Sequence, residues 1–272
     1  MPTPPHAHAR PGAQALRPSR ALAPFVDHYW FGSGRDAAVA TLRPDGRVDA
    51  VLAHSARGAA LSVHGSVTVR TELALQADAL YLGIQFRAGQ ARHFLHVPTP
   101  LLTDGALPGE DAFAPALPRL LDLSDPLAAV RAVEAALLQH LGRTPPRASR
   151  ADALVARIEA TRGAERIESL ADRFGIGRRQ VERCVLEAVG LTPKAFASIE
   201  RFTHAAACLR AGLPPAHAAF DAGYADQSHL HQAFRRYAAT TPARYARGEV
   251  AFLQDGKRVP HDHAGHRNPC PI

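Results

Sequence analysis

Residues 222–236 read AGYADQSHLHQAFRR, and an earlier stretch at residues 174–183, FGIGRRQVER, repeats their pattern. A constant offset of 49 residues aligns the two parts of the chain. The aligned pairs are Val181 with Leu230, Cys184 with Ala233, Val185 with Phe234, Gly190 with Ala239, Thr192-Pro193 with Thr241-Pro242, and Phe196 with Tyr245. At Gly175 and Gly223 the offset is 48 residues, so the second turn is one residue longer. Self-similarity at a fixed period predicts two related units in tandem.

Each unit has the order of elements found in a helix-turn-helix. A short helix, predicted over Ile167–Phe174 in the first unit and 214–222 in the second, precedes a tight glycine turn. Apolar residues then recur at helical spacing, as at Val181 and Val185, so the next helix has one buried and one polar face. In such a motif the second helix enters the major groove of DNA, where its first residues meet base edges.

The polar faces of these two recognition helices supply side chains suited to reading bases. Arginine forms two hydrogen bonds with guanine, glutamine does so with adenine, and glutamate accepts one from cytosine. The candidates are Arg178, Arg179, Gln180, Glu182 and Arg183 in the first unit, and Gln227, Ser228, His229 and Gln232 in the second, with His231, Arg235 and Arg236 nearby for phosphates. One polar face is commonly only a solvated surface, but two such faces after the same turn favour DNA binding.

The segment between the units has a suitable length to place both on one face of DNA. Thr192 is a good N-cap, Pro193 fits a first helical turn, and the helix can run to Ala211. At about 1.5 Å per residue such a helix is roughly 28 Å long, against roughly 34 Å for one DNA turn. The sequence therefore predicts that one chain reads a bipartite site in successive major grooves.

The two units resemble the AraC/XylS family of transcriptional regulators over residues 149–247. The first half of the resemblance rests on Leu170-Ala171, on RQVER at 179–183 and on GLTPK at 190–194. The more specific second half rests on AGYADQSHL at 222–230, FRRY at 234–237 and TTPARY at 240–245. This resemblance implies a monomeric DNA-binding module with two recognition helices, usually fused to an N-terminal domain that senses a ligand or dimerises.

The family's base-reading positions can be carried over residue by residue. They fall on Arg179, Gln180 and Arg183 in the first half, and on Gln227, Ser228, His229 and Gln232 in the second. Two positions depart from the family's pattern. Val185 stands where many members have a large aromatic residue, which implies a looser core in the first unit. Pro214-Pro215 alters the start of the helix that follows.

Charge is distributed unevenly along the chain, whose formal net charge is +7. Residues 147–248 contain 16 Lys and Arg against 10 Asp and Glu, and all but one of these cations are arginines. Residues 1–146 are nearly balanced, with 13 against 12. An arginine-rich segment can neutralise phosphates and release counterions, so this distribution favours a nucleic-acid partner for the C-terminal part.

Residues 21–142 predict a β-rich domain. Short apolar stretches are separated by tight-turn residues such as PDG at 44–46. The stretches are Val39–Leu42, 48–53, 61–64, 66–70 and 79–86. Their spacing predicts an antiparallel domain, cupin-like or a small barrel, and segments 42–49, 81–89 and 93–96 resemble sensor domains of one branch of the family. Trp30, Tyr81 and Phe86 fit either a ligand pocket or, more simply, the core.

A helix is expected to close this domain. Asp125 is its N-cap, Pro126 its first residue, and Gly142 lies just beyond its end. The apolar stripe, which would pack on the sheet or pair with a second subunit, comprises Leu127, Val130, Leu137, Leu138 and Leu141. The resulting α+β organisation is a disordered arm at 1–20, the β-rich domain at 21–142, a linker at 143–148, the double helix-turn-helix domain at 149–247 and a disordered tail at 248–272.

Composition excludes several classes of protein. No run of about 18 apolar residues occurs, and residues 1–20 lack the apolar stretch of a signal peptide. Cys184, Cys208 and Cys270 are scattered, share no metal-ligand spacing, and indicate no disulfide framework. We therefore expect a cytoplasmic protein without cofactor or membrane contact.

Catalysis is the main rival interpretation, because the chain has 15 histidines. His93 and His96 are spaced to share a metal, and His261, His263, His266 and Cys270 gather in the tail, but neither set has a convincing group of partners. No glycine-rich phosphate loop, Gly-x-Ser-x-Gly elbow or Cys-x-x-Cys pair occurs. We therefore expect no enzyme and no metal site.

Two alternatives stay open at this point. One is a metal-binding, cupin-like enzyme fused to a helical domain, and the other is a protein-interaction module without DNA specificity. The expected partner is double-stranded promoter DNA. RNA polymerase, a small-molecule effector and a second copy of the chain are further partners that the sequence leaves open.

Overall fold

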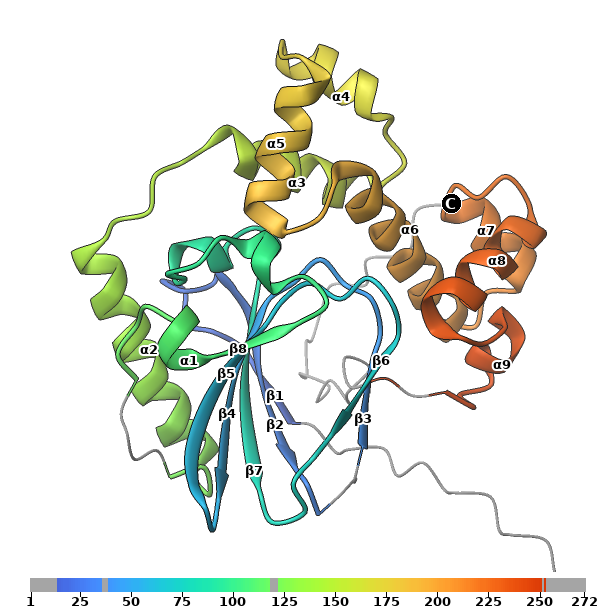
Figure 1. Ribbon diagram of the computed structural model, residues 1–272. Coiled ribbons are helices and arrows are strands. Elements are labelled where there is room, and N and C mark those ends of the chain that lie inside the picture. The colour runs from blue at the N-terminus through green and yellow to red at the C-terminus, as the bar shows by residue number, and fades with distance from the viewer. Residues whose placement is uncertain (1–13, 36–38, 118–121, 251, 253–272) are drawn as a thin grey trace, which may run out of the picture.

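The computed structural model describes residues 14–35, 39–117, 122–250 and 252. An N-terminal part built on β-sheets is followed by a C-terminal part built of helices (Figure 1). This arrangement confirms the α+β fold class predicted from the sequence, with an antiparallel sheet domain first and the helix-turn-helix units after it. None of the helices in the described ranges combines the length and apolar character needed to cross a membrane.

The N-terminal part contains a six-stranded antiparallel sheet and a two-stranded one. In spatial order, the larger sheet consists of β1 (Gln14–Leu16), β2 (Val26–Ser33), β7 (Leu80–Phe86), β4 (Asp49–Ser55), β5 (Gly58–His64) and β8 (Ala106–Pro108). The smaller sheet pairs β3 (Val39–Leu42) with β6 (Thr71–Ala74). Strand β7 is buried along nearly its whole length and lies between β2 and β4, so it forms the centre of the larger sheet.

Aromatic side chains fill the core of the sheet domain. Phe86 stacks on Phe94 with ring centroids 5.0 Å apart, and Phe25 meets Phe94 edge-on at 5.8 Å. Tyr81 and Phe86 are buried, so these two rings belong to the packed interior. Trp30 is half-buried and donates its indole N–H to Asp49 Oδ1 at 3.0 Å.

Helix α2 (Pro126–Arg143) packs against this core. Asp125 caps it as predicted, by accepting a 3.0 Å hydrogen bond from the Ala128 amide. The predicted apolar stripe was wrong at Leu127 and Leu138, which are 58% and 39% exposed. At about 100° per residue, these two lie roughly 120° or more round the helix from Val133, which is fully buried. The helix also passes through Gly142 instead of ending before it.

Other expectations for the N-terminal part need correction. Strand β1 lies within the residues expected to form a disordered arm, because its backbone pairs with β2; residues 1–13 lie outside the described ranges. Strand β2 was not foreseen, since its sequence, VDHYWFGS, mixes polar and aromatic residues. Residues 66–70 are not a strand, because Ser66 and Val67 form other contacts, and β6 follows at Thr71.

Seven helices make up the C-terminal part of the described chain: α3 (Arg150–Ala160), α4 (Ile167–Phe174), α5 (Arg178–Val189), α6 (Pro193–Arg210), α7 (Pro215–Asp221), α8 (Gln227–Ala238) and α9 (Pro242–Ala246). They share one core, in which Phe202 contacts Phe234 at 5.0 Å between ring centroids. Phe252, in the segment predicted as a disordered tail, is buried and packs on Tyr245 at 6.0 Å. Residues 251 and 253–272 lie outside the described ranges.

Candidate nucleic-acid interface

Helix α5 has the position of a recognition helix in the first unit. Gly175 ends α4 with φ of 61°, a left-handed conformation that favours glycine, and α5 begins three residues later. Val181 and Val185 are completely buried in the core shared with α3 and α6. The opposite face of α5 is therefore turned to solvent.

The residues predicted to contact DNA in the first unit differ in exposure. Arg178, Arg179 and Arg183 are exposed, whereas Gln180 and Glu182 are half-buried. Arg179 and Arg183 lie one helical turn apart, and neither forms a hydrogen bond or ion pair within the described part of the chain. These two guanidinium groups are accordingly the side chains of α5 most available to a ligand.

Arg178 is held by neighbouring carboxylates. Its Nε donates to Glu182 Oε1 at 2.9 Å, and its Nη1 donates to Glu168 Oε1 at 3.2 Å. The three side chains are 44–63% exposed, so each pair contributes little free energy. Sequence reasoning missed the pair with Glu168 because that residue lies on the preceding helix, α4. The pair with Glu182 has the i,i+4 spacing of one helix, and that spacing is a signal that could have identified it.

Helix α8 has the same relation to the second unit. Asp226 caps it by accepting a 2.7 Å hydrogen bond from the His229 amide, and the His229 ring meets Tyr224 edge-on at 5.0 Å. Of the seven predicted residues, His231 alone is half-buried. The exposed ones are Gln227, Ser228, His229, Gln232, Arg235 and Arg236. The start of α8 thus presents a row of polar side chains whose backbone is fixed by a cap.

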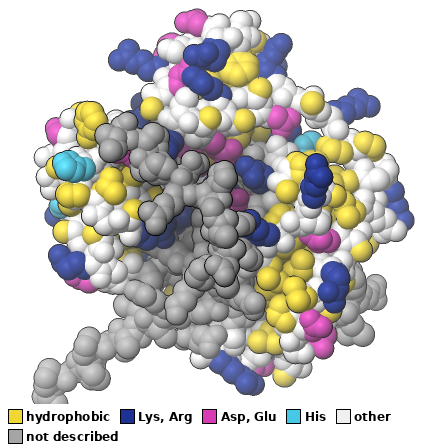
Figure 2. Space-filling view, turned by 180° about the vertical axis from the view of Figure 1, so that it is seen from behind, with side chains coloured by type: hydrophobic (Ala, Val, Ile, Leu, Met, Phe, Trp, Pro, Cys, Tyr) yellow, Lys and Arg dark blue, Asp and Glu magenta, His cyan; other side chains and the backbone are white. Residues whose placement is uncertain are grey.

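Helix α6 separates the two units. It has 18 residues and is therefore about 27 Å long, and Thr192 caps it by accepting from the Ala195 amide at 3.3 Å. Helices α4 and α5 lie near one end of α6, and α7 and α8 lie near the other (Figure 1). Basic side chains project around the top of the molecule, where α4 and α5 lie (Figure 2). The two helix-turn-helix units therefore lie at opposite ends of α6 (Figure 1).

The sheet domain contacts the first unit directly. Three of its hydroxyl groups donate hydrogen bonds to backbone carbonyls at the C-terminal end of α5. The pairs are Thr99 Oγ1 with Glu187 O at 2.7 Å, Ser66 Oγ with Val189 O at 2.7 Å, and Thr103 Oγ1 with Gly190 O at 2.8 Å. Carbonyls in the last turn of a helix have no partner within it, so these hydroxyls cap α5 from another part of the chain.

Arg47 forms a second connection between the two parts. Its guanidinium nitrogens lie 3.2 Å from Glu159 Oε1 on α3 and 3.6 Å from Glu200 Oε1 on α6. The three side chains are mostly buried, and burial raises the pKa of Glu159 although Arg47 opposes this effect. In the same turn, a Cβ atom on Gly46 would lie 2.3 Å from the Phe196 ring, so this close approach requires glycine.

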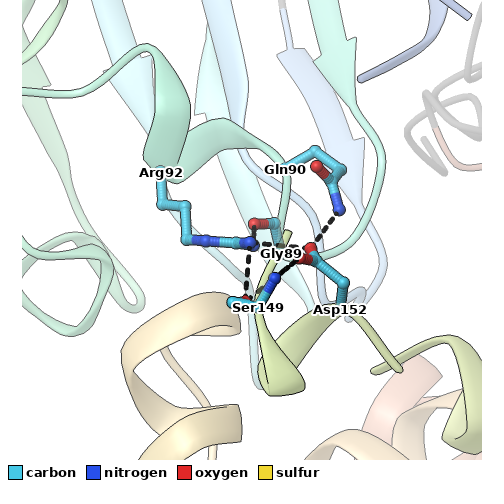
Figure 3. Close-up of polar contacts among 5 residues, drawn as sticks. All are labelled: Gly89, Gln90, Arg92, Ser149 and Asp152. Carbon is cyan, nitrogen blue, oxygen red and sulfur yellow. Dashed lines mark hydrogen bonds and ion pairs between the residues drawn. The ribbon is translucent and has the colours of Figure 1, made fainter. Parts of the chain in front are cut away.

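A third connection joins the loop after β7 to the start of α3, as Figure 3 shows. Gln90 Nε2 and Arg92 Nη2 donate to Asp152 Oδ1 at 2.9 and 2.7 Å, and Arg92 also donates to Ser149 Oγ at 3.2 Å and to Gly89 O. Burial raises the pKa of Asp152, but the hydrogen bonds from Arg92, Ser149 and Gln90 outweigh it and hold the pKa at about 2. The Asp152 carboxylate therefore accepts hydrogen bonds from four donor groups of three residues, Gln90, Arg92 and Ser149.

A cavity of about 360 Å³ lies beside this third connection. Arg92, His93, His96, His140 and Arg147 contribute to its lining, and no acidic residue of the described chain does. Burial lowers the pKa of His93, and Arg92 acts in the same direction. The cavity has a donor-rich, partly cationic wall.

The histidine pair that the sequence analysis weighed and set aside as a metal site differs from the group of potential metal ligands in the structure. His93 and His96 both line the cavity, but no third ligand joins them within the described residues. Three such side chains do converge elsewhere, at His204, Cys208 and Asp221. Sequence reasoning missed this group because Asp221 lies on a different helix from the other two. The tail histidines and Cys270 lie outside the described residues.

Protein families match both parts of the chain. A family described as a helix-turn-helix domain matches residues 170–248, and one described as a domain of unknown function (DUF6597) matches residues 14–108. The HTH-type transcriptional activator RhaS of Escherichia fergusonii is 34% identical over 88 residues, which make up 32% of this chain. The match also spans only 32% of that relative's length.

One similar solved structure is the C-terminal domain of AraT, a response regulator from Geobacillus stearothermophilus. It is 20% identical with a TM-score of 0.34, and the match covers 43% of this chain and 98% of that one. ToxT from Vibrio cholerae, bound to (E)-4-(8-methylnaphthalen-1-yl)but-3-enoic acid, is 7% identical, with a TM-score of 0.46 and coverage of 80% and 97%. The helix-turn-helix family match lies on the helices that carry the repeated motif. Residues 170–248 form an AraC-type helix-turn-helix domain, the DNA-binding domain of a family of transcriptional regulators.

Proposed function

We propose that the protein binds a bipartite site in double-stranded promoter DNA, with α5 and α8 in successive major grooves. The observation that carries this proposal is the pair of helices that each bury an apolar face and expose a polar one. Arg179 and Arg183 on α5 are the proposed readers of guanine, and Gln232 on α8 is the proposed reader of adenine. The proposed role of Arg235 and Arg236 is contact with phosphates, which positions the protein without reading sequence.

Our proposal assigns the other predicted residues supporting parts. Arg178 exchanges its carboxylate partners for a phosphate, while Gln180 and Glu182 contact bases from the edge of the α5 face. Gln227, Ser228 and His229 read the second half-site from the first turn of α8, and His231 contacts the backbone. The proposed partner is DNA, and the helix-turn-helix domain is of a type found in transcriptional regulators. We therefore propose a cytoplasmic protein without catalytic activity.

The sheet domain is proposed to control the first unit. It holds α5 through the three hydroxyl caps, and it holds α3 and α6 through Arg47. The cavity beside Arg92 is the proposed effector site, and its histidine and arginine lining favours an anionic small molecule. A ligand that engaged Arg92 there would compete with Asp152, and so would loosen the contact between the two parts.

Selection of bound duplexes from a random DNA pool tests the DNA-binding proposal. We expect two short motifs about one helical turn apart, the first altered by Arg183→Ala and the second by Gln232→Ala. Each change should weaken binding to the intact site by about 1–3 kcal/mol. Arg131→Ala, on the exposed face of α2, is the matched control and should change neither motif.

Two results would contradict the proposal. If no motif is enriched, sequence-specific binding by these helices is wrong. If DNA affinity changes little between two salt concentrations, phosphate contacts do not hold the complex, and a protein-interaction module becomes the better description.

A further inference from the structure

Three side chains that can bind a metal converge where α6 meets the end of α7, two helices that lie side by side in Figure 1. His204 and Cys208 lie one turn apart on α6, and Asp221 is the last residue of α7. Oδ2 of Asp221 lies 2.8 Å from Nε2 of His204 and 3.3 Å from Sγ of Cys208. His204 Nε2 and Cys208 Sγ lie 3.7 Å apart. One small ion could therefore contact all three.

These separations resemble the edges of a tetrahedral zinc site. With Zn–S of about 2.3 Å and Zn–N and Zn–O of about 2.0–2.1 Å, tetrahedral ligands lie roughly 3.3–3.6 Å from one another. The three observed distances are within about 0.5 Å of this range. Small side-chain rotations are enough to admit the ion.

Hydrogen bonding alone leaves a conflict at His204. Nη1 of Arg162 lies 2.6 Å from His204 Nε2. His204 Nε2 also faces the Asp221 carboxylate, at 2.8 Å from Oδ2. Arginine only donates and a carboxylate only accepts, so Nε2 meets one of them unfavourably whether or not it carries a proton. A cation between Nε2 and Oδ2 removes the conflict, and the half-exposed Arg162 side chain can then turn toward Asp221 alone.

The chemistry of the donor set selects the kind of ion. A thiolate, an imidazole and a carboxylate together favour zinc over magnesium or calcium, which prefer all-oxygen sites. Cys208 is buried, whereas the Asp221 side chain is 34% exposed, so the remaining coordination position is open to water.

We propose that His204, Cys208 and Asp221 bind Zn²⁺, with the Cys208 thiol giving up its proton to solvent and water as the fourth ligand. The ion joins α6 to the C-terminal end of α7, which has only seven residues and leads directly into the turn before α8. Binding therefore restricts the movement of α7 and of the first turn of α8. This expectation rests on the DNA-binding role proposed above: the ion should increase sequence discrimination at the second half-site and leave discrimination at the first unchanged.

Cobalt titration of the reduced, metal-stripped full-length protein tests the site itself. The protein carries His261→Ala, His263→Ala, His266→Ala and Cys270→Ser, so that the tail cannot supply ligands. We expect one equivalent of Co²⁺ to produce a thiolate-to-metal charge-transfer absorption, and Zn²⁺ to displace it.

Variants then identify the ligands. Asp221→Asn keeps the shape of an exposed side chain and should weaken Zn²⁺ binding about tenfold or more. His204→Gln should weaken it to a similar degree. Cys208→Ser should abolish the charge-transfer band. Cys184→Ser, at the half-buried cysteine of α5, is the control and should retain both the Zn²⁺ affinity and the charge-transfer band. Unchanged affinity in Asp221→Asn and Cys208→Ser, or loss of the band in Cys184→Ser, would overturn the site.

Duplex selection with and without Zn²⁺ tests the link to DNA separately. We expect sharper discrimination at the second half-site only, and no effect of Zn²⁺ in Asp221→Asn. Identical selections overturn the link to α8, whereas a chain that binds no DNA at all contradicts the proposed function. The cobalt titration decides the metal site in either case, because it requires no DNA.

Discussion

The Ser66 hydroxyl donates a 2.7 Å hydrogen bond to the backbone carbonyl of Val189, across 123 residues of sequence. Ser66 is only 1% exposed, so water cannot readily replace it as a donor. The carbonyl belongs to the last residue of α5, and the bond therefore ties the sheet domain to the first recognition helix. Changes in the sheet domain have a direct physical route to that helix.

Ser66→Ala should destabilise the protein by about 1–3 kcal/mol, because it leaves the Val189 carbonyl buried without this donor. Equilibrium denaturation with urea measures the change. Ser124→Ala, which removes an exposed contact with Asp122, is the control and should have an effect near zero. Equal effects of the two substitutions would mean that the bond to Val189 contributes nothing.

Arg47→Met should lower the free energy of unfolding by about 3 kcal/mol, because it leaves the mostly buried Glu159 and Glu200 side chains without their shared cation. Adding Glu159→Gln and Glu200→Gln to the same chain should recover most of the loss. Thermal unfolding of the single and triple variants checks both statements. Arg244→Met, which breaks an exposed pair with Glu249, is the control and should leave the melting temperature almost unchanged.

Asp45→Asn should flatten part of the pH dependence of stability. Burial, with the nearby Asp49 charge, raises the pKa of Asp45 to about 6. Between pH 4 and 6 the unfolded chain loses this proton while the folded one keeps it, so the group's stabilising contribution is full below pH 4 and is lost as the pH rises to 6. A shift of about 2 pKa units corresponds to about 3 kcal/mol.

The difference in unfolding free energy between wild type and Asp45→Asn, measured from pH 4 to 7, isolates this contribution. Asp111→Asn, at an exposed position of α1 (Gly109–Ala112), is the matched control, and its difference from wild type is the baseline for the Asp45→Asn result. A flat difference for Asp45→Asn relative to this baseline would show that its carboxyl titrates alike in both states.

Gly190 and Ala239 end the two recognition helices with positive φ angles of 84° and 50°, so substitutions at these aligned positions should have opposite signs. Ala239→Gly relieves a left-handed alanine and should stabilise the chain by up to about 1 kcal/mol. Gly190→Ala strains the backbone and places a Cβ 2.9 Å from Thr103 Oγ1, so it should cost about 2 kcal/mol. Calorimetry of the two variants checks the signs, and changes in the same direction would contradict them.

Local patterns predicted the helical part well. The span Ile167–Phe174, the caps at Asp125 and Thr192, and the buried faces of α5 and α8 follow from helical periodicity and from side chains that bond to nearby amides. Strand Val39–Leu42 was also predicted with its observed bounds. These features depend on residues close together in the chain.

Features that depend on distant contacts were not predictable. The segment 66–70 alternates like a strand, yet Ser66 and Val67 bond to Val189 and Asp45 instead. Leu138 has the apolar character of a core residue, but the sheet meets α2 on the side of Val133. On the candidate interface, periodicity identified the outward faces, whereas the pairing of Arg178 with Glu168 required the position of α4.

Trp30 is the one tryptophan of the chain, and it lies on β2 with its indole bonded to Asp49 and its ring against Gly83. Intrinsic tryptophan emission therefore comes from the sheet domain alone, and the helical part carries no such fluorophore. The protein thus contains its own optical reporter. A small molecule that rearranges the sheet will change that emission, and DNA bound at α5 or α8 will do so only if its effect is transmitted across the contacts at Ser66, Arg47 and Arg92.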